Sequence, residues 1–173
     1  DAALFAAGAS RPLADVVVSG ATVSDETKGC AALVLSALIF ECGIASARAL
    51  TSIRGGLARV VALGRDSPDA MGQIGAAALM HSLICVDGGA LLPEVAALRP
   101  AKTLKRVLSV CTLLLGKECA VSALHALANP NSAGHEERRS EMVDAGVIAE
   151  LKRLQSSTAD FELPNTARAI SQL

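Results

Sequence analysis

Aromatic residues are nearly missing from this chain of 173 residues, which has no Trp, no Tyr and only three Phe. About half of its residues are apolar (51%), and most of these are Ala, Leu and Val. Ala and Leu are strong helix formers, and Ala lets neighbouring helices approach closely. A β-sheet domain uses more β-branched and aromatic residues. The composition therefore predicts an all-α fold in one domain that is large enough for a sizeable core.

A surplus of one charge is also missing, because 16 basic and 17 acidic residues leave a formal net charge of −1. Such a balance gives no overall attraction to nucleic acid or to anionic lipid, and no aromatic residues interleave with the basic ones for base stacking. The mean hydropathy is high at +0.44. Even so, the near-apolar runs at 30–40, 74–86 and 107–115 are shorter than the roughly 20 residues of a membrane helix. We expect neither a nucleic-acid partner nor a membrane span.

Paired cysteine motifs are absent too. No C-x-x-C occurs, and the cysteines are odd in number: Cys30, Cys42, Cys85, Cys111 and Cys119. Most of them lie in apolar runs, where Cys acts as a small hydrophobic residue. We expect free thiols in a reducing intracellular compartment, with the cytoplasm favoured. Residue 1 is Asp, so a portion of a longer protein, or an organelle reached through a removed targeting peptide, is the alternative.

What the chain does have is a repeat. A Leu followed three residues later by an aliphatic residue recurs at Leu13, Leu57, Leu104 and Leu151, at intervals of 44, 47 and 47 residues. A second pattern follows each one and ends in Leu38, Leu83, Leu127 and Leu173. Apolar or small residues stand three, six and seven positions before those leucines, which places them on one side of a helix. Stacking of successive units would bury these faces in series.

Glycine and proline occur at the positions where the repeats predict that helices begin or end. Gly20, Gly64 and Gly116 each lie between the first and second patterns, where a helix is expected to end. Ser67 followed by Pro68 predicts an N-cap and a first helical residue. The charged run 135–139 is expected to be a loop. We therefore expect repeats over approximately 1–43, 44–87, 88–130 and 131–173.

Two segments resemble the armadillo repeat family. Residues 142–154 (MVDAGVIAELKRL) look like that family's second helix, and residues 119–129 (CAVSALHALAN) look like its third helix. The resemblance covers nearly the whole chain in four units, and the related HEAT repeats are an alternative. It implies a right-handed α-solenoid of about four armadillo-type repeats. It also implies that the third helices line a concave groove in which protein partners bind.

The resemblance also implies which side chains line that groove. Many armadillo proteins hold an extended peptide with an Asn one position before the terminal Leu of each repeat. Those positions and the ones a turn earlier are here Leu33, Ala37, Ala78, Ser82, Ser122, Ala126, Arg168 and Gln172. Because the Asn residues are missing, we expect an apolar groove that seats an apolar helix or a neighbouring subunit. The alternative is that these positions belong to the core.

A basic stripe is the second candidate surface. It follows the leucines of the first pattern and consists of Arg59, Lys105, Arg106, Lys152 and Arg153. The stripe suits an acidic partner, and its alternative is the solvated side of amphipathic helices.

Catalytic motifs are missing. The run at 135–139 (HEERR) lacks the second His of a zinc protease, the Gly pairs at 55–56 and 88–89 have no Lys-Ser/Thr after them and indicate turns, and no G-x-S-x-G occurs. His81 and His125 share one repeat position, which favours a repeat variant over a ligand. We expect no catalytic residues, no cofactor and no metal. The chain is then a non-catalytic protein-interaction scaffold, a subunit or interaction arm of a larger assembly. The alternatives are the substrate-recognition repeats of a ubiquitin ligase and a helical-repeat enzyme such as a pigment lyase.

Overall fold

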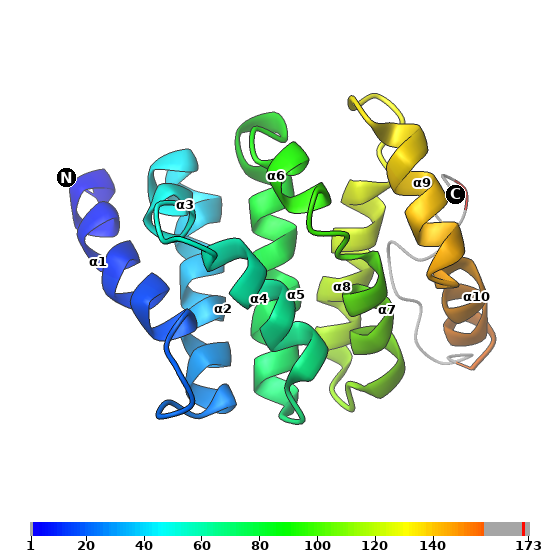
Figure 1. The fold of residues 1–173 in the computed structure, drawn as a ribbon, viewed down its shortest axis with the longest axis horizontal. Helices are drawn as coiled ribbons and strands as arrows, with labels where there is room; N and C mark the ends of the chain where they lie inside the picture. The colour runs from blue at the N-terminus through cyan, green and yellow to red at the C-terminus, as the bar shows by residue number, and fades with distance from the viewer. Residues whose placement is uncertain (1, 158–170, 172–173) are drawn as a thin grey trace.

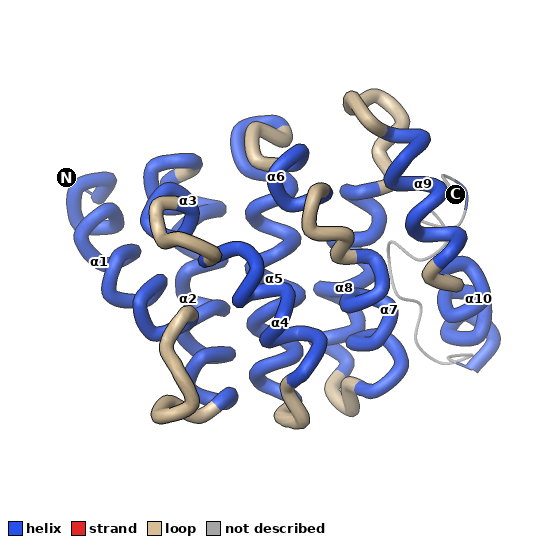
Figure 2. The backbone as a smooth tube through the Cα atoms, in the orientation of Figure 1, coloured by secondary structure: helices blue, strands red, loops and turns tan. Residues whose placement is uncertain are grey.

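The computed structural model describes residues 2–157 and residue 171, and this part of the chain holds ten α-helices, one 3-10 helix and no strand (Figure 2). The prediction of an all-α fold is therefore confirmed. The elements are α1 (Ala2–Val17), α2 (Asp25–Cys42), α3 (Ile44–Thr51), α4 (Gly56–Asp66), α5 (Ala70–Cys85), η1 (Val86–Gly88), α6 (Leu92–Ala96), α7 (Ala101–Val110), α8 (Leu114–Leu127), α9 (His135–Asp144) and α10 (Val147–Ser157).

The helices form two rows. The three long helices α2, α5 and α8 run side by side in the same direction, with α5 packed between the other two (Figure 1). The second row packs on the first, with α1 on α2, α4 on α5 and α7 on α8, and α10 contacts α7. A shorter helix precedes each of α4, α7 and α10. The order of short, medium and long helix thus recurs along the chain.

The core lies between the two rows. Leu35, Met80 and Leu124, which stand three positions before the end of the second pattern, are fully buried. Leu104 and Leu151 of the first pattern are buried as well, and Leu13 and Leu57 pack against the core while partly exposed. The apolar periodicity therefore identified the buried face of each long helix. The corresponding Ile170 and Leu173 lie outside the described residues.

Glycines bring α2 and α5 into backbone contact. A Cβ atom added to Gly75 would lie 2.2 Å from the carbonyl oxygen of Gly29, and one added to Gly29 would lie 2.1 Å from that of Met71. No side chain fits at such distances, so these two positions set how closely the helices pack. The small residues of the repeat pattern serve the same purpose.

Three local predictions about helix ends are wrong. Gly64 lies inside α4 and Gly116 in the first turn of α8. Both are buried, and an added Cβ would press on Thr103 and Ala76 at Gly64, or on the Cys111 sulfur at Gly116. They are packing glycines. The N-cap of α5 is Asp69, whose carboxylate accepts from the Met71 and Gly72 amides at 2.8 and 3.2 Å.

Several of the turns and repeat limits predicted from the sequence agree with the structure. Gly55, Gly88 and Gly89 adopt positive φ angles of 72°, 70° and 98°. Gly55 and Gly89 lie in turns as predicted, whereas Gly56 begins α4 and Gly88 ends η1. The expected repeat limits at 43/44 and 130/131 fall between α2 and α3 and between α8 and α9. The charged run at 135–139, expected as a loop, instead begins α9.

One stretch is long and apolar enough to cross a membrane. It is Ala70–Gly88, 19 residues with a mean hydropathy of 1.2, and it is the one such stretch in the described part of the chain. In this fold, 72% of that stretch is buried. Its packing between α2, α4 and α8 accounts for the apolar composition.

Candidate functional site

The side of α2, α5 and α8 that faces away from α1, α4 and α7 is the first candidate surface, here called the open face. On α2, the buried Ala32, Leu35 and Ile39 point toward the second row, so the opposite stripe comprises Cys30, Val34 and Ala37. All three are exposed, Val34 by 51%. Beside this stripe, Phe40 is 81% exposed. The first long helix thus presents apolar side chains to solvent.

Exposure identifies the rest of the open face. Around the buried Ala78, α5 contributes the partly or fully exposed Met71, His81 and Cys85, and α8 contributes Leu115, Cys119, Ser122 and Ala126. Leu115 is 50% exposed and Ser122 and Ala126 are partly exposed, whereas Ala78 is buried between its neighbours. By helical spacing, Glu26 and Glu41 on α2 and Glu118 on α8 are charged residues on this face. The open face is therefore mainly apolar, with small residues along its middle helix.

The structure places the predicted groove residues unevenly. Ala37 is exposed, Leu33, Ser122 and Ala126 are partly exposed, and Ala78 and Ser82 are buried. The Ser82 hydroxyl shares a 2.7 Å hydrogen bond with Ser36, whose hydroxyl also donates to the Ala78 carbonyl at 3.1 Å. These two α5 positions thus join α2 to α5 and offer a partner little surface. Arg168 and Gln172 lie outside the described residues.

His81 on α5 and His125 on α8 interact across the contact between those helices. Burial is the larger cause that lowers the pKa of His81 from 6.5, and the charge of His125 lowers it further. His81 is thus held neutral at physiological pH.

We expect this neutral histidine to make the stability of the chain depend on pH. Because the pKa of His81 is lower in the folded chain than in the unfolded chain, the unfolded chain takes up the proton first as the pH falls. The free energy of unfolding should therefore decrease from about pH 7 downward through 6.5. Urea unfolding of the wild type and His81→Gln across this range measures the effect. Equal pH dependence of the two proteins would contradict it.

Two thiols of the open face, those of Cys85 and Cys119, are poor nucleophiles. Burial, with smaller contributions from Glu118 and Cys111, raises the pKa of Cys119 to about 11, and burial raises the pKa of Cys85. A thiol with a raised pKa forms little of the reactive thiolate. Among the described residues, no group of three or more His, Cys, Asp or Glu is placed to hold a metal ion.

The predicted basic stripe does not form one surface. Arg59 donates to the Val18 carbonyl, and Arg153 pairs with Glu150 at 2.6 Å. Lys152 is exposed on α10. Lys105 and Arg106 instead line a cavity between α4 and α7, together with three basic residues outside the predicted stripe, Arg65, Arg99 and Lys102. Sequence reasoning missed these three because they come from different elements, although the run Lys102, Lys105, Arg106 shows the spacing of one helix face.

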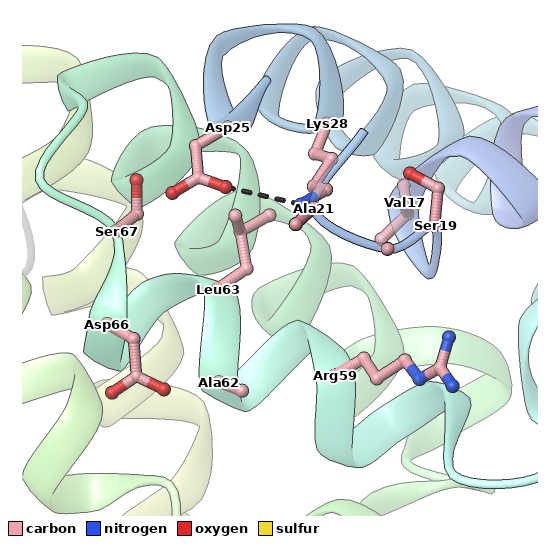
Figure 3. Close-up of a pocket in the computed structure, with 11 residues that line it drawn as sticks. Val17, Ser19, Ala21, Asp25, Lys28, Arg59, Ala62, Leu63, Asp66 and Ser67 are labelled. Atoms are coloured by element: carbon pink, nitrogen blue, oxygen red, sulfur yellow. Dashed lines mark hydrogen bonds and ion pairs between the residues drawn. The ribbon is translucent and has the colours of Figure 1, made fainter. Parts of the chain in front are cut away.

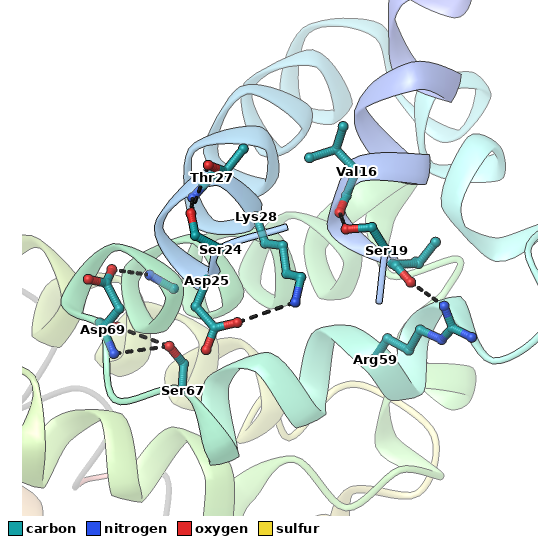
Figure 4. A network of polar contacts seen from close by, with 11 residues as sticks. Val16, Ser19, Ser24, Asp25, Thr27, Lys28, Arg59, Ser67 and Asp69 are labelled. Carbon is teal, nitrogen blue, oxygen red and sulfur yellow. Dashed lines mark hydrogen bonds and ion pairs between the residues drawn. The ribbon is translucent and has the colours of Figure 1, made fainter. Parts of the chain in front are cut away.

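A separate cavity of about 440 Å³ lies where the loop after α1 meets α2 and α4 (Figure 3). Its charged residues balance, with Lys28 and Arg59 against Asp25 and Asp66, and Lys28 pairs with Asp25 at 3.3 Å. Arg59 donates to the Val18 carbonyl. Figure 4 shows that Ser67 accepts from the Asp69 amide. Of these contacts, the one from Arg59 joins α4 to the end of α1, and the other two are local to α2 and to the loop before α5.

No protein-family model matches the chain, and the comparisons with curated proteins and with solved structures likewise found no match.

Proposed function

We propose that this chain is a non-catalytic scaffold that binds other proteins, built as a right-handed α-solenoid of armadillo-type repeats. The recurring order of short, medium and long helix supports the solenoid. Each unit of three helices, such as α3, α4 and α5, buries its apolar face by packing against the neighbouring unit. α1 and α2 form an incomplete first unit. On this reading, α2, α5 and α8 are the third helices of their repeats.

The single observation that carries the binding function is the apolar open face. Val34, Phe40 and Leu115 are large side chains that are at least half exposed, and they border small residues on α5 and α8. Exposed apolar patches of this kind mark protein interfaces. The Asn residues with which many armadillo proteins hold an extended peptide are missing from this sequence. The preferred occupant is therefore a partner helix with its own apolar stripe.

Acidic residues on the open face indicate which charges the partner helix would carry. Glu41 and Glu118 flank the apolar stripe, so basic residues beside the partner's apolar face would complement them. The exposed thiols Cys30 and Cys85 lie on the same face, which suits a reducing compartment. We place the protein there, within a larger assembly.

A peptide-display selection tests this proposal. A library of amphipathic helices is selected against the wild-type chain, and the enriched peptides are then measured against the double variant Val34→Glu, Leu115→Glu. Both side chains are exposed, so the variant should fold normally and lose binding about a hundredfold. The matched control is Lys152→Glu on α10, which should bind as the wild type does.

Two results would overturn the proposal. One is that no helical peptide is enriched. The other is that the enriched peptides bind the double variant and the control equally well, which would place the interface elsewhere.

A further inference from the structure

The cavity between α4 and α7 is lined by charged side chains of one sign. Its volume is about 510 Å³, and its lining includes five basic residues and no acidic one: Arg65, Arg99, Lys102, Lys105 and Arg106. It lies on the second row of helices, away from the open face. A cluster of like charges is unfavourable in the absence of a counter-charge, so it calls for a functional explanation.

Three separate elements bring these side chains together. Lys102, Lys105 and Arg106 lie three and four residues apart on α7 and share one helix face. Arg65 comes from the last turn of α4. Arg99 precedes α7 in a left-handed backbone conformation with φ 51°, which is unusual for a residue other than Gly, and particularly before Pro100. The cluster therefore depends on the folded arrangement and not on one charged segment.

The protein neutralises this cluster only in part. Asp66 accepts two hydrogen bonds of 2.8 Å from Arg65, and electrostatic interactions link Arg99 with Glu141 and Lys105 with Glu150. Glu150 also pairs with Arg153 at 2.6 Å, so five positive charges face at most three carboxylates and an excess of positive charge remains. In addition, the Nη1 atom of Arg106 is buried and has no hydrogen-bond partner within the described residues. A buried guanidinium nitrogen normally has an acceptor.

We propose that this cavity binds a phosphate monoester group carried by a phosphorylated segment of a partner protein. A phosphorylated side chain bears about −1.5 to −2 charges, which would offset the excess positive charge, and its oxygens accept the paired donors of a guanidinium group. That the phosphate belongs to a partner protein depends on the proposed scaffold function. The phosphate site itself is inferred from the residues that line the cavity.

The surroundings favour one localised phosphate over an extended polyanion. The lining has no aromatic side chain on which nucleic-acid bases stack. Asp66, Glu141 and Glu150 border the cluster, and they would repel the continuous negative charge of a nucleic acid or of an anionic membrane.

Fluorescence anisotropy with labelled degenerate peptides tests the site. One pool carries a central phosphoserine and the other carries serine. The phosphorylated pool should bind at least about tenfold tighter, and Lys102→Gln and Arg106→Gln should each weaken it about tenfold. Lys152→Gln removes an exposed lysine outside the cavity and should leave binding unchanged. Binding should also weaken below about pH 6, where the phosphate gains its second proton.

Several outcomes would overturn the assignment: equal binding of the two pools, equal losses in Lys152→Gln and Arg106→Gln, or tighter binding of single-stranded RNA or of anionic phospholipid vesicles. Competition by inorganic phosphate at the same concentration as the peptide would assign the site to a small free phosphate compound and not to a partner protein. Thermal unfolding of each variant shows whether it is folded. Helix binding at the open face should persist in Arg106→Gln, so the two proposals fail independently.

Discussion

Replacing Gly75 with alanine should destabilise this chain by about 3 kcal/mol or more. The added Cβ atom would lie 2.2 Å from the carbonyl oxygen and 2.6 Å from the Cα atom of Gly29. Both are backbone atoms, so no change of side-chain conformation relieves the clash. α2 and α5 would have to move apart. That movement would loosen the packing that buries the side of α5 facing α2. Urea unfolding measures the loss.

Gly8→Ala is the matched control. Gly8 also lies inside a helix, α1, but an atom added there meets nothing within 4 Å. Because alanine favours helix over glycine, this variant should be more stable by about 0.5–1 kcal/mol. If Gly75→Ala were as stable as Gly8→Ala, the close approach of α2 and α5 would not exist in solution.

Replacing Arg138 with methionine should cost about 3 kcal/mol, the second large effect that the structure predicts. Arg138 is 5% exposed, and its Nε donates to the Leu127 carbonyl at 2.8 Å. Its Nη atoms donate to the Ala133 carbonyl and the Ser132 hydroxyl. One side chain thus satisfies the end of α8 and holds the loop that leads to α9. Methionine fills a similar volume but leaves those acceptors without a donor.

Two further variants separate the hydrogen bonds from simple charge. Arg138→Lys keeps the positive charge but lacks the planar donors, and it should fall between wild type and Arg138→Met in stability. Arg48→Met removes an exposed arginine from α3 and should change the free energy of unfolding by less than about 0.5 kcal/mol. A similar loss in Arg48→Met and Arg138→Met would contradict the role given to Arg138.

The buried faces of the long helices could be predicted from the sequence. Leu35, Met80 and Leu124 stand at the same place in successive repeats, and all three are buried. This worked because apolar periodicity depends on the helix alone, and each helix repeats it. The all-α class followed from the Ala and Leu content for the same local reason.

Features that depend on contacts between helices could not be predicted. Gly64 and Gly116 have the sequence context of helix ends, but they are glycines because a neighbouring helix leaves no room for a Cβ atom. Arg138 lies in a charged run typical of a solvated loop, yet it is buried by the loop that its own side chain organises. The basic cavity joins Arg65 to residues on α7 that are 37 or more positions away. No spacing rule relates such residues.

Photo-crosslinking tests the central claim, that the open face binds a partner helix, most directly. A selected helical peptide carries a photoreactive group on its apolar stripe, and mass spectrometry identifies the residues to which it attaches. The account predicts attachment on α2 between Cys30 and Phe40 and on α8 between Leu115 and Ala126. Attachment confined to α4, α7 and α10 would contradict it.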